Sequence, residues 1–451
     1  MPVAPARAAA FEILLKIDSG AGHCDELLHS LRVQALSAQD RNLCTTLVMG
    51  TLRWQIALDA QVRAYLKRPN EKLDARVLLA LRLGAFQLLH LDRIPPHAAI
   101  SESVELAKSS GNQFAAGMVN AILRKVATAK RIPLPEAFGD VAKMASALAH
   151  PDWLVKRWAA RYGLAVAEKI CRFGQGQPPT SIRLLNKDAE EKLLAEGMEL
   201  EPGSFLASAR NVIRGDVTTT DTYREGLIRI QDEGSQLVAE LAGEGRSILD
   251  CCAAPGGKTA ILAERNPEAR VVACDVSGRR LERMKRLLQT SADPSRIEYQ
   301  VADAVQLNYR DEFDLVVCDV PCSGTGTLAR NPEIRHRLTL EALERHHRRQ
   351  AEILLASMKT VRPDGHLLYA TCSLEPEENE SVVEECLQAA NGFRRLPMEE
   401  RLDSMAAKNA IGVDATAELR RSAFNDGYLR TIPGVHRCDG FFAALLVRDS
   451  K

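Results

Sequence analysis

The C-terminal half of the chain alternates short apolar runs with amphipathic stretches, and this rhythm restricts the fold more than any other feature. From Arg246 onward the apolar runs are SILDCC, RVVACDVS, RIEYQVAD, FDLVVCDV and GHLLYATCS. Amphipathic segments such as GRRLERMKRLLQTS and LEALERHHRRQAEILLASMK lie between them. Apolar strands that alternate with helices form a parallel sheet covered on both faces. The pattern therefore predicts an α/β domain over residues 245–451, with the terminal GFFAALLVRD as an antiparallel edge strand.

The first part of the chain has a different periodicity, with apolar residues three and four positions apart. From Ala6 to about Ala129 this spacing predicts short helices, so residues 1–140 are expected to form an all-α bundle. KRIPLPEAFGD then has the proline and charge content of a linker. Strand-like runs at PPTSIRLLN, NVIRGD and LIRIQDE predict a small α+β linking subdomain over residues 149–244. A chain of 451 residues is too long for one ordinary core, and several domains fit that length.

Composition is typical of a globular cytoplasmic protein. The chain is 46% hydrophobic and 26% charged, and its apolar runs are shorter than the roughly 18 residues that a membrane helix needs. Its 11 cysteines form no CxxC pair, so zinc spacing is missing and a reducing compartment is expected. The formal net charge of zero argues neither for nor against nucleic acid as a partner. We therefore expect a cytoplasmic protein without a membrane segment or a metal.

The loops after the predicted strands contain acidic side chains and glycines, which leave the main chain accessible. AAPGGKT has neither the GxGxxG nor the P-loop spacing, but Gly256 and Gly257 let a ligand approach the main chain. Four successive strands end in or near an aspartate, at Asp250, Asp275, Asp303 and Asp319. One such aspartate is usually a helix cap, whereas four along one edge fit a ligand with ribose hydroxyls, an amine and a cationic group. S-adenosylmethionine has these groups, and we expect Lys258 to contact its carboxylate.

Two cysteines differ from the rest because each follows a strand end among polar and turn residues. These are Cys322 and Cys372, whereas four others are interpreted as core packing, namely Cys251, Cys274, Cys318 and Cys386. Cytosine C5 is a poor nucleophile, but a thiolate that adds to C6 turns C5 into an enamine-like carbon that attacks a methyl sulfonium. This chemistry needs a low-pKa cysteine, an acid near N3 and the amine, and a route for elimination. With Asp319, the two cysteines supply these groups, and chemistry alone permits either one to attack.

Two groups of basic residues are candidates for contact with RNA. The first is interpreted as a basic helix that is either a solvated face or an RNA contact, and comprises Arg63, Lys67, Arg68, Lys72 and Arg76. The second follows the Cys322 loop and comprises Arg330, Arg335, Arg337, Arg345, Arg348 and Arg349. Its closeness to the predicted site favours phosphate contact. Because the target base must reach a pocket, an unpaired or flipped cytosine is expected.

Three other classes of protein share part of this pattern. A DNA cytosine methyltransferase has Pro-Cys after its fourth strand, but it does not need Thr371-Cys372, and its Glu-Asn-Val is absent here. An RNA-binding or antitermination factor would account for the bundle, but not for the thiol pair and the glycine loop. A nicotinamide-dependent dehydrogenase is disfavoured because GxGxxG is missing.

The motifs CCAAPGGKT, DVPCSGTGTLARNPEIR and ATCSLEPEENE resemble those of the RNA 5-methylcytosine methyltransferases of the Fmu/RsmB/NOL/Sun family. The order of the N-terminal helices, with LVMGTLRW and GMVNAILRKV, is similar to the NusB-type RNA-binding bundle found in the branch that modifies small-subunit ribosomal RNA. The resemblance implies a multidomain fold: an all-α NusB-like bundle, an α+β linking subdomain and a Rossmann-like class I methyltransferase domain.

The same resemblance implies an activity and residue roles. The activity is methylation of cytosine C5 in 16S rRNA by a monomer, with S-adenosyl-L-methionine as cofactor. In that family the Thr-Cys cysteine is the nucleophile and the Pro-Cys cysteine assists release of the product, which assigns these roles to Cys372 and Cys322. Asp319 would hold the exocyclic amine and N3. The cofactor positions implied are Cys252, Ala253, Ala254, Pro255, Gly256, Gly257, Lys258, Asp275, Asp303 and Asp319.

Overall fold

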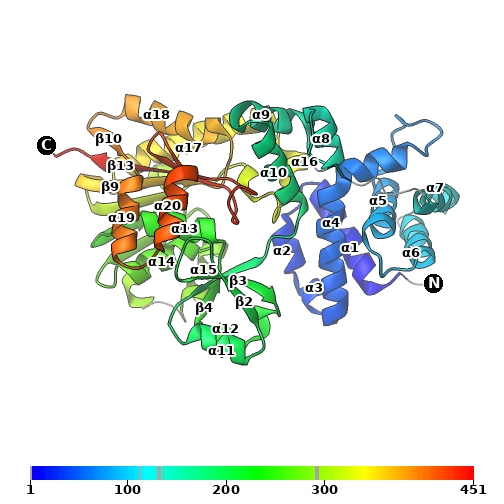
Figure 1. The fold of residues 1–451 in the computed structure, drawn as a ribbon, viewed down its shortest axis with the longest axis horizontal. Coiled ribbons are helices and arrows are strands. Elements are labelled where there is room, and N and C mark those ends of the chain that lie inside the picture. Colours follow the sequence, from blue (N-terminus) through cyan, green and yellow to red (C-terminus); the bar gives the residue numbers. More distant parts are fainter. Residues whose placement is uncertain are drawn as a thin grey trace. The chain divides into compact units, whose positions relative to one another are not determined.

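A computed structural model of the protein describes residues 3–109, 111, 113–128, 134–135, 137–289 and 294–450 (Figure 1). Contacts divide the chain into two units. The helical unit comprises residues 1–177 with the separate segment Leu328–Arg337. The other unit, residues 178–327 with 338–451, contains the predicted catalytic residues and is called the catalytic unit below. Residues 130–133 and 136 of the predicted linker lie outside the described residues. Every helix that the described ranges contain is too short or too polar to cross a membrane.

The helical unit is built from helices, and those up to residue 128 share one core. These are α1 (Pro5–Asp18), α2 (Cys24–Leu28), α3 (Leu31–Gln34), α4 (Ala38–Arg63), α5 (Ala75–His90), α6 (Pro96–Ser109), η1 (Gln113–Ala115), α7 (Ala116–Thr128), α8 (Val141–Ala147), α9 (Asp152–Tyr162), α10 (Leu164–Gln175) and α16 (Ile334–Arg337). Ser37 caps α4 by accepting a hydrogen bond from the Asp40 amide. Gly50 lets α4 and α5 approach closely, because a Cβ there would lie 1.9 Å from Phe86 Cζ. The predicted all-α N-terminal region is therefore confirmed.

The predicted basic helix Arg63–Arg76 is wrong. α4 ends at Arg63 and α5 begins only at Ala75, so most of these basic residues lie in the connection between the two helices. Pro69 interrupts the helical pattern because proline lacks an amide donor, and Arg63 Nη1 donates to its carbonyl at 2.8 Å. Three exposed cations remain in the connection, namely Lys67, Arg68 and Lys72.

A small antiparallel sheet begins the catalytic unit and corresponds to residues 178–244 of the predicted α+β subdomain, whose first part, residues 149–177, belongs to the helical unit. Its strands are β1 (Thr180–Leu184), β2 (Glu199–Pro202), β3 (Ala209–Arg214) and β4 (Ile228–Ile230), in the order β2-β3-β1-β4. Helices α11 (Ala189–Ala195) and α12 (Asp221–Arg224) accompany it, with η2 (Val217–Thr219). Ile182, Leu193 and Ile228 belong to its separate core. The chain then enters the large sheet through α13 (Glu233–Leu241).

The large sheet confirms the predicted α/β architecture, with one correction. Its strands are β5 (Ser247–Asp250), β6 (Arg270–Asp275), β7 (Ile297–Val301), β8 (Phe313–Asp319), β9 (Val361–Thr371), β10 (Phe393–Leu396), β11 (Phe424–Asn425), β12 (Tyr428–Thr431) and β13 (Phe441–Arg448). The first five are parallel and are ordered β9-β8-β5-β6-β7. β13 is antiparallel as predicted, but it is not an edge strand, because it pairs with β9, β12 and β10.

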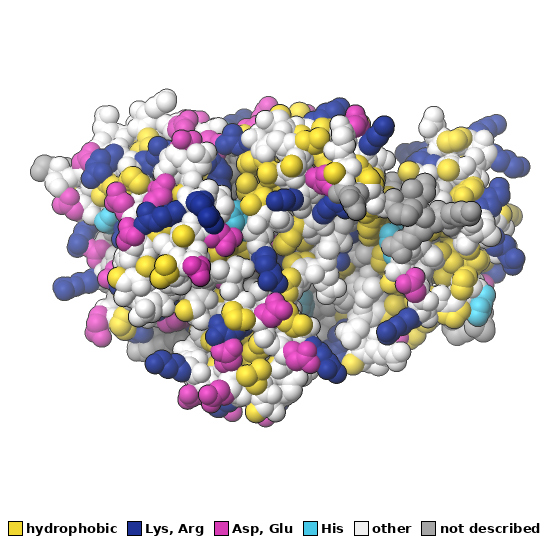
Figure 2. Space-filling model, viewed as in Figure 1, with side chains coloured by type: hydrophobic (Ala, Val, Ile, Leu, Met, Phe, Trp, Pro, Cys, Tyr) yellow, Lys and Arg dark blue, Asp and Glu magenta, His cyan; other side chains and the backbone are white. Residues whose placement is uncertain are grey.

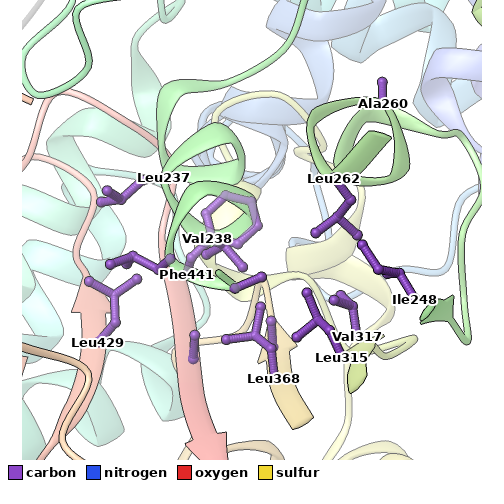
Figure 3. Close-up of a cluster of buried hydrophobic side chains, with 14 of the residues drawn as sticks. Leu237, Val238, Ile248, Ala260, Leu262, Leu315, Val317, Leu368, Leu429 and Phe441 are labelled. Atoms are coloured by element: carbon purple, nitrogen blue, oxygen red, sulfur yellow. The ribbon is translucent and has the colours of Figure 1, made fainter. Parts of the chain in front are cut away.

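Helices cover both faces of the large sheet, as its uniformly apolar strands require. Ile248 belongs to the core that contains side chains of α13, α14 (Gly257–Arg265), α15 (Gly278–Leu288), α19 (Glu399–Ala407) and α20 (Val413–Ser422). Leu249, the next residue along β5, belongs to the core formed with α17 (Leu340–Met358) and α18 (Glu380–Ala389). Figure 3 shows part of the first core, where Leu237 and Val238 of α13 lie near Phe441 of β13.

Candidate active site

The carboxyl ends of the parallel strands bring the predicted acidic residues to one edge of the sheet. Asp250, Asp275 and Asp319 are the last residues of β5, β6 and β8. Asp303 follows the end of β7 by two residues and caps the short helix η4 (Ala304–Gln306). The neighbours β5 and β8 form the topological switch point, because the strand order reverses between them. Ligands of open α/β sheets bind at such points, so the fold places these residues where a ligand is expected.

The two candidate thiols come from adjacent parallel strands and lie side by side. Cys372 directly follows β9, Cys322 follows β8 by three residues, and their Sγ atoms are 3.3 Å apart. The Gly326 amide donates to the Cys372 carbonyl at 2.9 Å, which joins the two loops. The hydrogen bond with Cys372, together with burial, raises the pKa of the Cys322 thiol well above its ordinary value. Cys322 therefore stays protonated and can donate its hydrogen to a thiolate on Cys372.

The four cysteines interpreted as core packing are confirmed as such. Each is at most 1% exposed, and each lies in a core of the large sheet: Cys251, Cys274, Cys318 and Cys386. All 11 cysteines of the chain carry free thiols.

A buried carboxylate that the sequence motifs did not single out holds both cysteine loops. Glu378 is fully buried, and its Oε1 accepts a hydrogen bond from the Ser323 amide at 2.7 Å. Its Oε2 accepts from the hydroxyls of Ser323 and Ser373. Because these serines adjoin Cys322 and Cys372, one side chain fixes the loop of each thiol. Glu378 lies in the quoted EPEENE stretch, but spacing alone did not show that its carboxylate folds back under the cysteines.

Asp319 and Lys258 form an ion pair in the wall of a cavity of about 590 Å³. Lys258 Nζ lies 2.7 Å from Asp319 Oδ2 and donates to Ser235 Oγ at 3.1 Å. The glycine loop predicted for the cofactor contributes further wall residues, namely Cys252, Ala253, Pro255, Gly256 and Gly257. The structure thus brings Asp319 and most of that loop to one cavity. The Lys258 ammonium is directed to Asp319, so a contact with a cofactor carboxylate stays a prediction.

Asp250 adds a perturbed carboxyl group to the same cavity wall. Burial raises its pKa to about 7, although Thr259 donates a hydrogen bond of 2.6 Å to Oδ2. Oδ1 is buried and has no partner among the described residues. A buried acceptor without a partner favours a ligand that brings a hydrogen-bond donor or a positive charge.

Asp275, Asp303 and Ala254 are placed beside the cavity wall rather than in it. Asp275 is 3% exposed and accepts hydrogen bonds from the Ser277 amide at 2.8 Å and the Ala254 amide at 3.3 Å. Arg280, which the sequence motifs did not identify, pairs with Asp275 at 3.3 Å and donates to the Ala254 carbonyl. Asp303 pairs with Arg349, whose hydrogen bond lowers the pKa of that carboxyl. Both carboxylates therefore order the loops at the strand ends.

Gly256 is required by the backbone at this site. It caps α14 in a left-handed conformation with φ +106°, which side chains other than glycine rarely adopt. An added Cβ would also lie 2.6 Å from Met284 Cγ. The open cradle of main chain at residues 252–258, with the unpartnered Asp250 oxygen, fits the amino-acid end of S-adenosylmethionine.

The predicted phosphate contacts after the Cys322 loop are wrong for Arg335 and Arg337. Arg335 is 1% exposed inside the helical unit. These two guanidinium groups donate to main-chain carbonyls of that unit, at Arg53, Ala149, Gly174, Ile17 and Gly22. A buried guanidinium needs such acceptors, and carbonyls rather than phosphates supply them here.

The sheet order, the glycine cradle and the acidic strand ends define the catalytic unit as a methyltransferase. Models of three families match consecutive parts of the chain. They are the NusB family over residues 4–128, the ferredoxin-like domain of RsmF/B-like methyltransferases over residues 150–211, and the 16S rRNA methyltransferase RsmB/F over residues 239–447.

Full-length relatives agree with these matches. A probable ribosomal RNA small subunit methyltransferase B of Bacillus subtilis is 32% identical over 97% of this chain and 97% of its own. A ribosomal RNA small subunit methyltransferase B of Xanthomonas campestris is 33% identical over 91% of this chain and 90% of its own. The chain belongs to the RsmB/F family of small-subunit rRNA methyltransferases. The crystal structure of PH0851 covers 100% of both chains with a TM-score of 0.78 at 23% identity, which shows a shared fold.

Proposed function

We propose that this rRNA methyltransferase transfers a methyl group from S-adenosyl-L-methionine to C5 of a cytosine in 16S rRNA, through a covalent bond between Cys372 and C6 of the base. The observation that carries the proposal is the pair of thiols 3.3 Å apart at the ends of two adjacent parallel strands. A methyl transfer to an amine or a ribose hydroxyl needs no thiol, whereas transfer to the weakly nucleophilic C5 does.

The raised pKa of Cys322 gives the two thiols different roles. While Cys322 stays protonated, its hydrogen bond stabilises the thiolate of Cys372, which adds to C6. Once Cys372 is a thioether, it carries no charge, and the main cause of the raised Cys322 pKa is gone. Cys322 then releases its proton to water, although burial still raises its pKa, and its thiolate takes the C5 proton after methyl transfer. The electrons of the broken C5–H bond restore the C5–C6 double bond, and Cys372 leaves as a thiolate.

Asp319 is proposed to hold the Watson–Crick edge of the cytosine. Its carboxyl accepts a hydrogen bond from the exocyclic amine and passes a proton toward N3, where negative charge develops when the thiolate adds. Because Asp319 is ionised in its pair with Lys258, that proton comes from the Lys258 ammonium 2.7 Å away. Lys258 keeps the carboxyl in place through the contact at 2.7 Å, and Ser235 orients Lys258 by accepting its hydrogen bond at 3.1 Å. Lys258 is 8% exposed, whereas the Asp319 side chain is 31% exposed, so the carboxyl stays open to a base that enters the cavity.

The cofactor is proposed to lie against the main chain of residues 252–258. When bound, it supplies an electrophilic methyl group on a sulfonium. Asp250 would accept its ammonium, since Oδ1 is otherwise without a partner in the described structure. The other hydrogen-bond donors of the cofactor are proposed to bind the carboxylates of Asp275, Asp303 and Asp319.

Methylation of an in vitro 16S rRNA transcript with labelled S-adenosyl-L-methionine tests the proposed function. We expect label in the RNA and a cytosine that resists bisulfite conversion, because 5-methylcytosine is not deaminated. Wild-type protein heated until it unfolds is the control. Label in an adenosine, a guanosine or a ribose, with every cytosine still converted, would contradict the proposal.

The helical unit is proposed to recognise RNA without taking part in the chemistry, in a cytoplasmic enzyme that acts as a monomer. The NusB match over residues 4–128 supports this role, with the exposed cations Lys67, Arg68 and Lys72 as contacts. Replacing all three by glutamine should weaken binding of the transcript about tenfold, since each phosphate contact adds salt-dependent affinity.

Filter binding at several salt concentrations measures that loss of affinity. The matched control replaces three exposed lysines of α8, α9 and α10 by glutamine, at Lys143, Lys156 and Lys169. Equal losses in both triple variants would mean that only total charge matters, and the connection between α4 and α5 would then have no special role.

A further inference from the structure

The cavity in the catalytic unit has a second wall that the proposed methyl transfer does not use. Besides the glycine loop, Asp319 and Arg224, which pairs with Asp221, the lining includes side chains of β4 and of α15, on either side of that loop in sequence. Three of them are arginines, namely Arg229, Arg283 and Arg286. On the face drawn in Figure 2, basic and acidic side chains are interspersed.

Arg229 is a buried cation with unused donors. Its side chain is 13% exposed, and Nη2 pairs with Glu264 at 3.3 Å. Nε and Nη1 are buried and have no partner among the described residues. Burial lowers the pKa of Arg229 to about 10, so it stays charged at neutral pH. A buried guanidinium with two free donors in a cavity wall calls for an acceptor from a ligand.

Arg283 and Arg286 extend this positive wall along α15. They are three residues apart and therefore lie on the same side of the helix, and both are exposed. Leu287 and Ile230 line the same cavity and are 49% and 44% exposed. Guanidinium groups beside exposed apolar side chains suit a single-stranded nucleic acid, whose phosphates and bases they bind together.

We propose that Arg229, Arg283 and Arg286 bind the sugar–phosphate backbone of the RNA strand next to the target cytosine. This inference rests on the proposed function, because it takes the base held by Asp319 to be part of an RNA chain. Anchoring the neighbouring phosphates in the cavity that contains Asp319 brings an unpaired strand to that residue. The arginines act on binding and positioning of the substrate and do no chemistry.

The test compares Arg283→Gln/Arg286→Gln with the full-length wild type. We expect the affinity for a 16S rRNA transcript to fall at least tenfold. The slope of log affinity against log salt should shrink by about 1.4, because each phosphate contact on a single strand contributes about 0.7. The Kd for S-adenosylhomocysteine should not change. Arg229→Gln should weaken RNA binding in the same way, and Glu264 keeps its partner Arg183 at 2.7 Å in that variant.

The matched control is Arg279→Gln/Lys285→Gln, which removes two exposed charges from the same helix but outside the cavity wall. An equal loss of RNA affinity in this control would overturn the proposal, as would unchanged affinity in the cavity variants. A weaker Kd for S-adenosylhomocysteine would assign the arginines to the cofactor instead. RNA binding is measured without methyl transfer, so failure of the proposed chemistry would show separately, as a wild type that binds the transcript but leaves every cytosine unmethylated.

Discussion

Replacing Cys372 by alanine is expected to abolish methyl transfer, whereas replacing Cys322 should trap the enzyme on its RNA. Without the Cys372 thiolate no bond to C6 forms, so kcat should fall by about 10⁴-fold or more. Cys322→Ala keeps the nucleophile but loses the group that takes the C5 proton. It should methylate once and stay attached through Cys372. Denaturing gel electrophoresis of the protein with labelled transcript detects the covalent complex as a slow band.

Two further variants sharpen this experiment. The double variant Cys322→Ala/Cys372→Ala should give no slow band, because the adduct needs Cys372. Cys386→Ala removes a core thiol on α18 and should retain turnover, which controls for loss of any buried cysteine. A covalent band in Cys372→Ala, and its absence in Cys322→Ala, would transfer the nucleophile role to Cys322.

Much of the fold follows from local pattern. The alternation of apolar strands with amphipathic helices predicted the parallel sheet, because both faces of such strands must be covered; Ile248 and Leu249 indeed belong to opposite cores. The loops that carry Asp319, Cys322 and Cys372 could be placed at one edge for the same reason. The carboxyl ends of parallel strands meet there whatever the loops contain.

Apart from the basic helix that Pro69 interrupts, the errors concern contacts between segments distant in sequence. The run ARNPEIR has the composition of a solvated basic stretch, yet Arg335 is 1% exposed, because Leu328–Arg337 belongs to the helical unit. Glu378 looked like one of several acids in a polar stretch, but it is fully buried between the two cysteine loops. β13 was predicted as an edge because it is the last strand. β12 and β10 also pair with β13, and no hydrophobic pattern in the sequence predicts that pairing.

The positively charged cavity wall also depends on contacts between separate segments of the chain. Arg229 is on a three-residue strand of the small sheet, and Arg283 is on a helix of the large one. A motif search treats each as a surface charge. Only the packing of the small sheet beside α15 within the catalytic unit brings both to one cavity with Asp319. The proposed substrate path therefore depends on tertiary packing, whereas the proposed reacting groups can be identified from sequence motifs.

Asp319→Asn should separate binding of the base from binding of the cofactor. Asparagine preserves the shape and can accept a hydrogen bond from the cytosine amine, but it cannot pass a proton toward N3. The neighbouring Lys258, which pairs with Asp319 at 2.7 Å, also loses its counter-charge. We expect kcat to fall by about 10²- to 10⁴-fold, the range for loss of a general acid. Steady-state kinetics at saturating cofactor and RNA measures this fall.

Asp275→Ala is expected to weaken cofactor binding and to spare kcat, which is the reverse of the result expected for Asp319→Asn. The Asp275→Ala variant lacks a charged acceptor for the ribose hydroxyls. Because that contact contributes about 1.5–3 kcal/mol, the Kd for S-adenosylhomocysteine should rise at least tenfold. Its kcat should largely recover at saturating S-adenosyl-L-methionine, since Asp275 stands apart from the cavity wall that holds Asp319. Calorimetry gives the Kd for S-adenosylhomocysteine of both variants. The control is Glu298→Ala, which removes an exposed carboxylate of β7. If Asp319→Asn also recovers at high cofactor, Asp319 serves the cofactor alone, and the proton must reach N3 through another group.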